Sequence, residues 1–253
     1  MDKFEREKER ELYTAKIDFF TNVAHEIRTP LTLIKSPLEN VLVSQSVSDD
    51  IRDDLETMEL NTNRLLDLVN QLLDFRKTET QGFQLNFVEC DVSELLQKTY
   101  KRFKPLAREK GLALSIETPE SLYASVDREG LTKIISNLLT NAIKYSETYI
   151  RIRLYSEGER LLLSVCNDGL VIPVEMREEI FKPFIQYKTG TLRSVPGTGI
   201  GLALARSLAE LHEGTLCMED SMENNCFLLS LPLKHEQTVA CLLYTSPSPR
   251  DMR

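Results

Sequence analysis

Apolar side chains recur in alternating steps of three and four residues through the first third of the chain. This spacing predicts two long helices whose apolar stripes pack in a bundle or a coiled coil. The polar segment 44–50 between them is rich in residues that form turns and cap helices, so we expect an antiparallel hairpin. The first stripe consists of Ile17, Phe20, Ala24, Ile27, Leu31, Ile34, Leu38 and Val41, and the second of Ile51, Leu55, Met58, Thr62, Leu65, Val69 and Leu72.

The predicted hairpin, residues 1–80, is expected to form a homodimer. A single hairpin of this kind has two apolar faces and can bury only one of them. A second copy covers the other face and gives a four-helix bundle with two-fold symmetry. Residues 1–16 mix charges of both signs and are expected to form a solvated helical lead-in.

His25 follows a core position of the first helix, so we expect it at the edge of the apolar seam. Glu26 is its neighbour, and Thr29 lies one turn further along the same face as His25. Pro30 has no N–H to donate and crowds the carbonyl of Glu26, so the helix should bend or loosen beside the histidine. This arrangement suits chemistry at the imidazole. The alternative is a helix histidine with a solvated neighbour, and only motifs further along the chain can decide between the two.

Length and composition limit the function classes. The 253 residues have room for one large domain or two modest ones, and a net charge of -8 without a basic stripe excludes a nucleic-acid surface. No apolar run reaches the roughly 18 residues that a membrane helix needs. We therefore expect a soluble, cytosolic chain that meets a membrane only through a segment upstream of it. Five scattered cysteines without a Cys-x-x-Cys pair predict reduced thiols and no zinc site.

Near residues 78–82 the helical pattern gives way to a mixed pattern, which predicts an α+β sandwich with a mixed sheet and helices on one face. We expect a second domain at 81–234 and a disordered or extraneous tail at 235–253. The predicted strands are 83–87, 112–117, 122–126, 149–155, 160–166, 215–219 and 226–232, and the predicted helices are 91–110, 127–145 and 198–212.

The predicted helix 127–145 carries the first downstream motif. Asn137, Asn141 and Lys144 share one helix face, while apolar residues occupy another, and Tyr145 follows directly. Two amides and an ammonium group can hold a hydrated magnesium ion and phosphate oxygens while the helix stays anchored. The alternative is an amphipathic surface helix with chance asparagines, which is less attractive because asparagine is a poor helix former.

A second motif, Asn167-Asp168-Gly169, stands at the exit of a predicted strand and is followed by Ile172-Pro173. A short polar side chain beside a glycine suits recognition of a purine edge, although alone the motif is an ordinary turn. A third motif spans residues 197–202 and leads into a helix, where converging backbone N–H groups favour an anion. Five of the ten glycines fall within residues 169–201, which indicates a mobile loop over a ligand.

In this order, and behind the histidine hairpin, these motifs resemble those of the sensor histidine kinases of two-component systems over about residues 15–233. The hairpin also resembles that of hybrid sensor kinases, which carry a fused receiver domain. The matching segments are a phosphoacceptor motif at 25–31, an asparagine motif at 137–144, a first glycine motif at 165–173, a phenylalanine motif at 181–184 and a second glycine motif at 197–202.

The resemblance implies a dimeric protein-histidine kinase with a C-terminal α/β sandwich of the GHKL type. The γ-phosphoryl group of ATP would pass to His25 and then to an Asp of a response-regulator receiver domain, fused or separate. Glu26 would fix the imidazole tautomer, and Thr29 would orient a water for a phosphatase reaction. The chain would be the cytoplasmic portion of an inner-membrane-anchored bacterial sensor.

The resemblance also implies a nucleotide site in the second domain. Magnesium would be held mainly by Asn141, the phosphates by Asn137 and Lys144, and adenine by Asn167 and Gly169, under a lid formed by residues 185–201. The remaining nucleotide-binding residues would be Tyr145, Ile172, Phe184, Gly197, Thr198, Gly199, Gly201 and Leu202.

Two residues depart from the family pattern, and two other functions stay open. The family has Asp at the position of Asn167 and a second glycine at the position of Val171, so we expect weaker adenine binding and a stiffer loop. A degenerate scaffold that binds nucleotide with little kinase activity is one alternative. An ATPase of the same sandwich fold is another, but it would need a glutamate near Asn137 to activate water.

Overall fold

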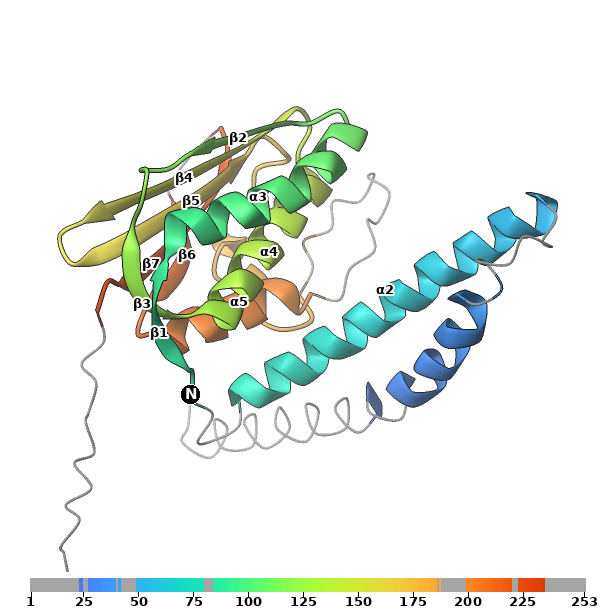
Figure 1. Ribbon diagram of the computed structural model, residues 1–253. Coiled ribbons are helices and arrows are strands. Elements are labelled where there is room, and N and C mark those ends of the chain that lie inside the picture. The colour runs from blue at the N-terminus through green and yellow to red at the C-terminus, as the bar shows by residue number, and fades with distance from the viewer. Residues whose placement is uncertain are drawn as a thin grey trace, which may run out of the picture.

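Figure 1 shows the computed structural model of the chain. The structure describes residues 23–24, 27–39, 41, 49–79, 84–185, 187, 199–219 and 223–234. His25, Glu26, Gly197 and Thr198 lie outside the described residues, as do the predicted lead-in 1–16, most of the predicted turn and lid, and the tail 235–253. None of the helices in the described part is both long and apolar enough to cross a bilayer.

The N-terminal part is the predicted helical hairpin. Residues 27–39 are helical and run alongside α2, Asp49–Glu79 (Figure 1). Ala24 and Leu31 of the first helix pack against Val69 and Leu73 of α2 in a small buried cluster. The Arg28 guanidinium also donates a hydrogen bond of 2.6 Å to the side-chain oxygen of Asn70 on α2. The two helices are thus joined by both apolar and polar contacts.

On each helix of the hairpin, the apolar residues form two rows with a spacing of seven residues. One row is buried against the other helix, and the second row is exposed. Ala24, Leu31 and Leu38 are buried, whereas Ile27, Ile34 and Val41 are exposed. The same division recurs along most of α2, where Thr62 and Val69 are buried and the other row is exposed as far as Leu65. That second row comprises Ile51, Met58 and Leu65, which are 55%, 58% and 46% exposed. A single hairpin therefore buries only half of its predicted seam.

The C-terminal part is an α+β sandwich, as predicted. A five-stranded mixed sheet has the order β2-β4-β5-β7-β6, and only the β2–β4 pair is parallel. Helices α3, α4 and α5 cover one face of this sheet, and β1 and β3 form a separate antiparallel pair (Figure 1). The bounds are β1 Phe87–Asp91, α3 Val92–Glu109, β2 Ala113–Glu117, β3 Tyr123–Asp127, α4 Arg128–Tyr145, β4 Tyr149–Glu157, β5 Arg160–Asn167, α5 Gly201–Leu211, β6 Thr215–Met218 and β7 Asn225–Pro232.

Local capping signals fix where the helices begin and end. Asp91 accepts hydrogen bonds from the backbone N–H groups of Ser93 and Glu94 at the start of α3. Asp127 does the same for Gly130 at the start of α4, at 2.7 Å. Gly111 follows α3 with a φ of +72°, a conformation that glycine adopts without strain. These three boundaries agree with the sequence prediction.

The predicted strand 83–87 is wrong. The first strand begins at Phe87, and the described residues before it, 84–86, are not in a strand. The β1–β3 ladder pairs Phe87 with Asp127, which is both the last residue of β3 and the N-cap of α4. Residues before Phe87 therefore have no strand to pair with, although their polar and apolar residues alternate. Helix α5 likewise begins at Gly201 rather than at residue 198.

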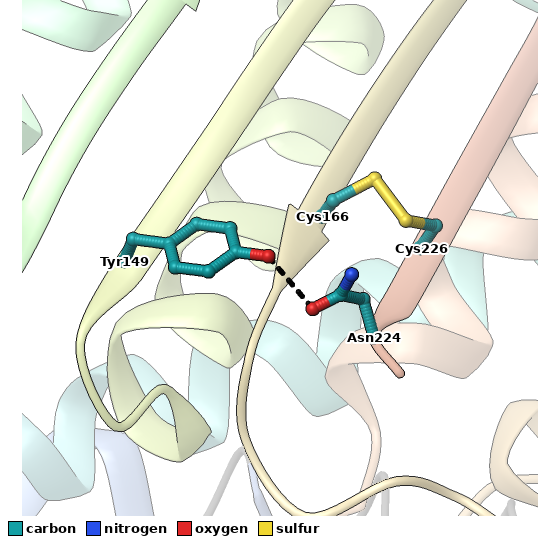
Figure 2. The surroundings of a disulfide bond; sticks show 4 residues. All are labelled: Tyr149, Cys166, Asn224 and Cys226. Carbon is teal, nitrogen blue, oxygen red and sulfur yellow. Dashed lines mark hydrogen bonds between the residues drawn. A yellow bond between two sulfur atoms is a disulfide. The ribbon is translucent and has the colours of Figure 1, made fainter. Parts of the chain in front are cut away.

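A disulfide between Cys166 of β5 and Cys226 of β7 corrects the prediction of reduced thiols (Figure 2). The two cysteines are direct partners in the β5–β7 ladder, which brings their Cα atoms within 4.0 Å despite a separation of 60 residues. Next to it, the Tyr149 hydroxyl donates a 2.7 Å hydrogen bond to the Asn224 side chain (Figure 2). Cys90 and Cys217 are free thiols. The pairing depends on strand register, so cysteine spacing could not reveal it.

The C-terminal end of α2 packs against the sandwich. Phe75 is only 3% exposed and belongs to the sandwich core, and the Asp74 carboxylate lies 3.0 Å from the Lys133 ammonium of α4. The Ser207 hydroxyl of α5 donates a 3.0 Å hydrogen bond to the Thr78 hydroxyl. These contacts fasten the hairpin to the same two helices, α4 and α5, that carry the candidate site.

Candidate functional site

Helix α4 presents the first set of predicted site residues. Asn137, Asn141 and Lys144 are half-buried along its outer face, and the opposite face is fully buried in the core. The Lys144 ammonium lies 4.6 Å from the centre of the Tyr145 ring, a cation–π distance. The structure therefore brings two amides and one cation together on an anchored helix, as the spacing predicted.

The start of α5 meets this face of α4. A Cβ atom on Gly201 would lie 3.1 Å from the Asn137 side-chain oxygen, so the α5 backbone passes directly beside that amide. The preceding residue, Ile200, has no side-chain oxygen to cap the first N–H groups of the helix. A helix N-terminus that no side chain caps favours an anion. Leu202, the next predicted residue, is half-buried in the first turn of α5.

The phenylalanine motif and the second glycine motif are joined. The Phe184 N–H donates a 2.9 Å hydrogen bond to the carbonyl oxygen of Gly199. A Cβ on Gly199 would come within 2.7 Å of the Ile185 carbonyl oxygen, and its φ of +71° also favours glycine. Two segments that are 15 residues apart in sequence are thus in direct backbone contact, beside the start of α5.

The first glycine motif lies against the end of α4. Gly169 packs so closely on the Tyr145 carbonyl oxygen that no side chain could be accommodated. Asp168 accepts hydrogen bonds from the backbone N–H groups of Glu147, Thr148 and Tyr149 and from the Thr148 hydroxyl. Burial would raise the pKa of the Asp168 carboxyl, but these hydrogen bonds outweigh it and lower the pKa to about 2. The loop is therefore tied to the helix that carries Asn141.

Asn225, the first residue of β7, holds the same loop from the other side. Its side-chain oxygen accepts a 2.9 Å hydrogen bond from the Ile172 N–H, and its Nδ2 donates to the carbonyl oxygens of Leu170 and Gly169, at 2.8 and 3.3 Å. Sequence reasoning missed this residue. It belongs to none of the motifs, and its role depends on the pairing of β5 with β7, so no local signal could have identified it.

Asn167 is the only side chain of this loop with an unmet polar group. It is 2% exposed, and its Nδ2 group is buried without a hydrogen-bond partner in the described part of the chain. A buried donor of this kind costs about 1–3 kcal/mol. Such a cost is expected where a ligand supplies the missing acceptor, and a purine ring edge carries acceptors. The amide and the neighbouring glycine therefore fit the predicted role in base binding.

The phosphoacceptor segment is described only in part. Thr29 is exposed on the first helix, one residue from the Arg28 side chain that reaches α2. His25 and Glu26 lie outside the described residues, and so do Gly197 and Thr198 of the second glycine motif. Their predicted roles stay predictions.

Two known domain families match the chain. Residues 15–81 match the His Kinase A (phospho-acceptor) domain, and residues 126–235 match the histidine kinase-, DNA gyrase B- and HSP90-like ATPase domain. A phospho-acceptor hairpin followed by an ATPase sandwich defines a class of signalling kinases. The chain belongs to the sensor histidine kinases of two-component systems.

Individual relatives agree with this assignment. The sensor histidine kinase TmoS of Ectopseudomonas mendocina is 36% identical over 232 residues, which are 90% of this chain and 24% of TmoS. The structure of histidine kinase ThkA in complex with response regulator protein TrrA is 25% identical, with a TM-score of 0.61 over 91% of this chain and 66% of that one. Full-length ShkA in complex with AMPPNP shares the fold, with 24% identity and a TM-score of 0.72 over 85% of this chain and 45% of ShkA. The chain thus spans about a quarter of TmoS.

Proposed function

We propose that this chain is an ATP-dependent kinase that phosphorylates His25 and then passes the phosphoryl group to an Asp of a receiver domain. The observation that carries the proposal is the convergence of four separated motifs at one end of the sandwich. The Asn137 side chain lies beside Gly201, and the Phe184 N–H donates a hydrogen bond to Gly199. Gly169 packs against the Tyr145 carbonyl at the end of α4. This convergence is what a site for a nucleoside triphosphate needs.

Each group around the site has a role in this proposal. Asn167 and Gly169 would contact the base, and Asn137, Lys144 and the N-terminus of α5 would contact the phosphates. A magnesium ion, held mainly by Asn141, would neutralise charge on the transferred phosphoryl group. Asn137 and Asn141 are amides and cannot act as bases, so the site itself is better suited to positioning ATP than to activating water.

At the acceptor, the His25 imidazole would attack the γ-phosphorus through its free ring nitrogen, forming a nitrogen–phosphorus bond as the bond to the β–γ bridging oxygen breaks and ADP leaves. Glu26 would accept a hydrogen bond from the other ring N–H and so raise the nucleophilicity of the free nitrogen. Thr29 would orient a water for an opposing phosphatase reaction, which would hydrolyse the receiver's aspartyl phosphate and release inorganic phosphate. Pro30 would allow the helix to move His25 in and out of reach. If so, P30A should change the ratio of kinase to phosphatase activity, and an unchanged ratio would count against this role.

The partners proposed are a second copy of the chain and a receiver domain. The uncovered apolar rows on both hairpin helices support a homodimer, because a second hairpin would bury them in a four-helix bundle. A response regulator is proposed because ThkA, a similar kinase, forms such a complex. That the chain is the cytoplasmic portion of an inner-membrane-anchored sensor stays a prediction.

The proposal is tested by incubating the chain with magnesium and γ-labelled ATP. We expect an acid-labile, alkali-stable label that is absent from H25Q and N141A but present in H235Q, which removes another of the three histidines. Mixing H25Q with N141A should restore label if one protomer phosphorylates the other. Label on H25Q, or release of phosphate without any protein label, would refute the kinase assignment.

A further inference from the structure

The Asn167 amide offers a nucleobase both a donor and an acceptor. Its Nδ2 group is buried without a partner, and it lies beside Gly169, where a Cβ would be 3.0 Å from that nitrogen. A carboxylate of the same shape would offer only acceptors. The choice of an amide at this position therefore changes which base edges can be bound.

The two purine types present opposite patterns on this edge. Adenine has a donor at its 6-amino group and an acceptor at N1, whereas guanine and hypoxanthine have an acceptor at O6 and a donor at N1. A carboxylate accepts from the adenine amine and repels O6. An amide matches either pattern, because rotation about its Cβ–Cγ bond exchanges the oxygen and the nitrogen.

No other acidic group of the loop can supply the missing repulsion. Asp168 is the only acidic residue between Val165 and Pro173. Its carboxylate is occupied by the N–H groups of residues 147–149 and by the Thr148 hydroxyl. The Asn225 side chain, which also touches the loop, is another amide, and it is occupied by the loop backbone. Among the described side chains of this loop, discrimination against O6 therefore falls to Asn167.

We propose that this base site accepts 6-oxopurine nucleotides as well as ATP, with Asn167 as the residue that determines base specificity. The inference rests on the proposed function, since it assumes that the nucleotide base faces Asn167. A site can exclude a competing ligand through a repulsive contact, and an amide in place of a carboxylate removes the repulsion of O6.

The test is calorimetric titration of the whole chain with ATP, ITP and GTP in magnesium, with CTP as a control for binding through the phosphates alone. ITP isolates the effect of O6 and N1, because it lacks the 2-amino group of GTP. We expect the Kd values for ATP and ITP to agree within about tenfold and CTP to bind much more weakly. The isosteric variant N167D should bind ATP at least as tightly as the wild type and lose about 100-fold in affinity for ITP.

If the wild-type protein binds ATP but its Kd for ITP is at least 100-fold higher than its Kd for ATP, the inference is overturned and the proposed kinase activity is unaffected. Failure to bind ATP itself would overturn both. The wild-type ratio of the two Kd values decides the question even if N167D does not fold. Equal binding of CTP and ITP would also overturn it, because the base would then play no part.

Discussion

The Cα atom of Gly169 lies directly against the main-chain carbonyl oxygen of Tyr145, at the end of α4. No side chain fits between them, and the φ of Gly169 is not positive, so the requirement is one of space alone. This contact sets the distance between the first glycine motif, residues 165–173, and α4, the helix that carries Asn141. The first glycine motif is thus a packing element as well as a candidate binding element.

G169A should therefore destabilise the sandwich by about 3 kcal/mol or more, because overlap with backbone cannot be relieved by a rotamer change. The matched control is G158A, at the β4–β5 turn, where φ is +57° but the space around the added Cβ is open. That variant should lose only about 1 kcal/mol through backbone strain. Urea unfolding monitored by circular dichroism measures both. Equal losses in the two variants would contradict the packing role of Gly169.

The Asp168 carboxylate should make the sandwich sensitive to acid. Its pKa is about 2 in the folded protein, below the usual 3.8. A lowered folded pKa contributes stability that is fully present above the unfolded pKa and is lost as the pH falls from about 4 to 2. The contribution should be about 1–2 kcal/mol, since Asp168 is partly exposed. As the pH is lowered from 7 to 2, the free energy of unfolding should fall less steeply for D168N than for the wild type. Parallel curves for the two proteins would refute this role.

The parts of this fold that depend on interactions between near neighbours in the sequence could be predicted. The parts that depend on which strands pair, and in which register, could not. Asp91 and Asp127 cap helices through bonds to residues two or three positions away, so their roles can be inferred from the sequence. The Cys166–Cys226 disulfide and the Asn225 contacts arise only once β5 pairs with β7. The wrong strand at 83–87 shows the same limit, since alternation does not reveal whether a partner strand exists.

Within the candidate site, the motif residues on α4 and at the two glycine loops were predictable because their spacing matches a known family. The contacts that hold the motifs together were not. Asp168 was named only as part of a motif, yet it ties the loop to residues 147–149. That role depends on where α4 ends relative to β5, which no single segment of the sequence specifies.

Reduction of the Cys166–Cys226 disulfide should destabilise the sandwich. The bond closes a loop across 60 residues, and opening a loop of that size releases enough entropy in the unfolded chain to cost about 4 kcal/mol. Thermal unfolding with and without a dithiol measures the effect. The double variant C166A/C226A should be as unstable as the reduced protein and should not respond to the dithiol. Two free thiols at these positions in protein purified without reductant would contradict the bond itself.

The uncovered apolar row of α2 should govern self-association. Leu65 lies on the row shared by Ile51 and Met58, seven residues apart, and is 46% exposed in the single chain. L65E should therefore leave the hairpin folded but dissociate a dimer, because a second hairpin would bury the charge without a partner. Sedimentation velocity measures the change, with a loss of affinity of about 100-fold or more expected.

Leu60 provides the matched control for this prediction. It lies on the same helix and is more exposed, at 70%, but it falls outside the seven-residue row. If the row forms the interface, L60E stays a dimer while L65E becomes a monomer, although both replace an exposed leucine with the same charge. If general apolar exposure drove association instead, L60E would weaken the dimer at least as much as L65E, and the proposed four-helix arrangement would be wrong.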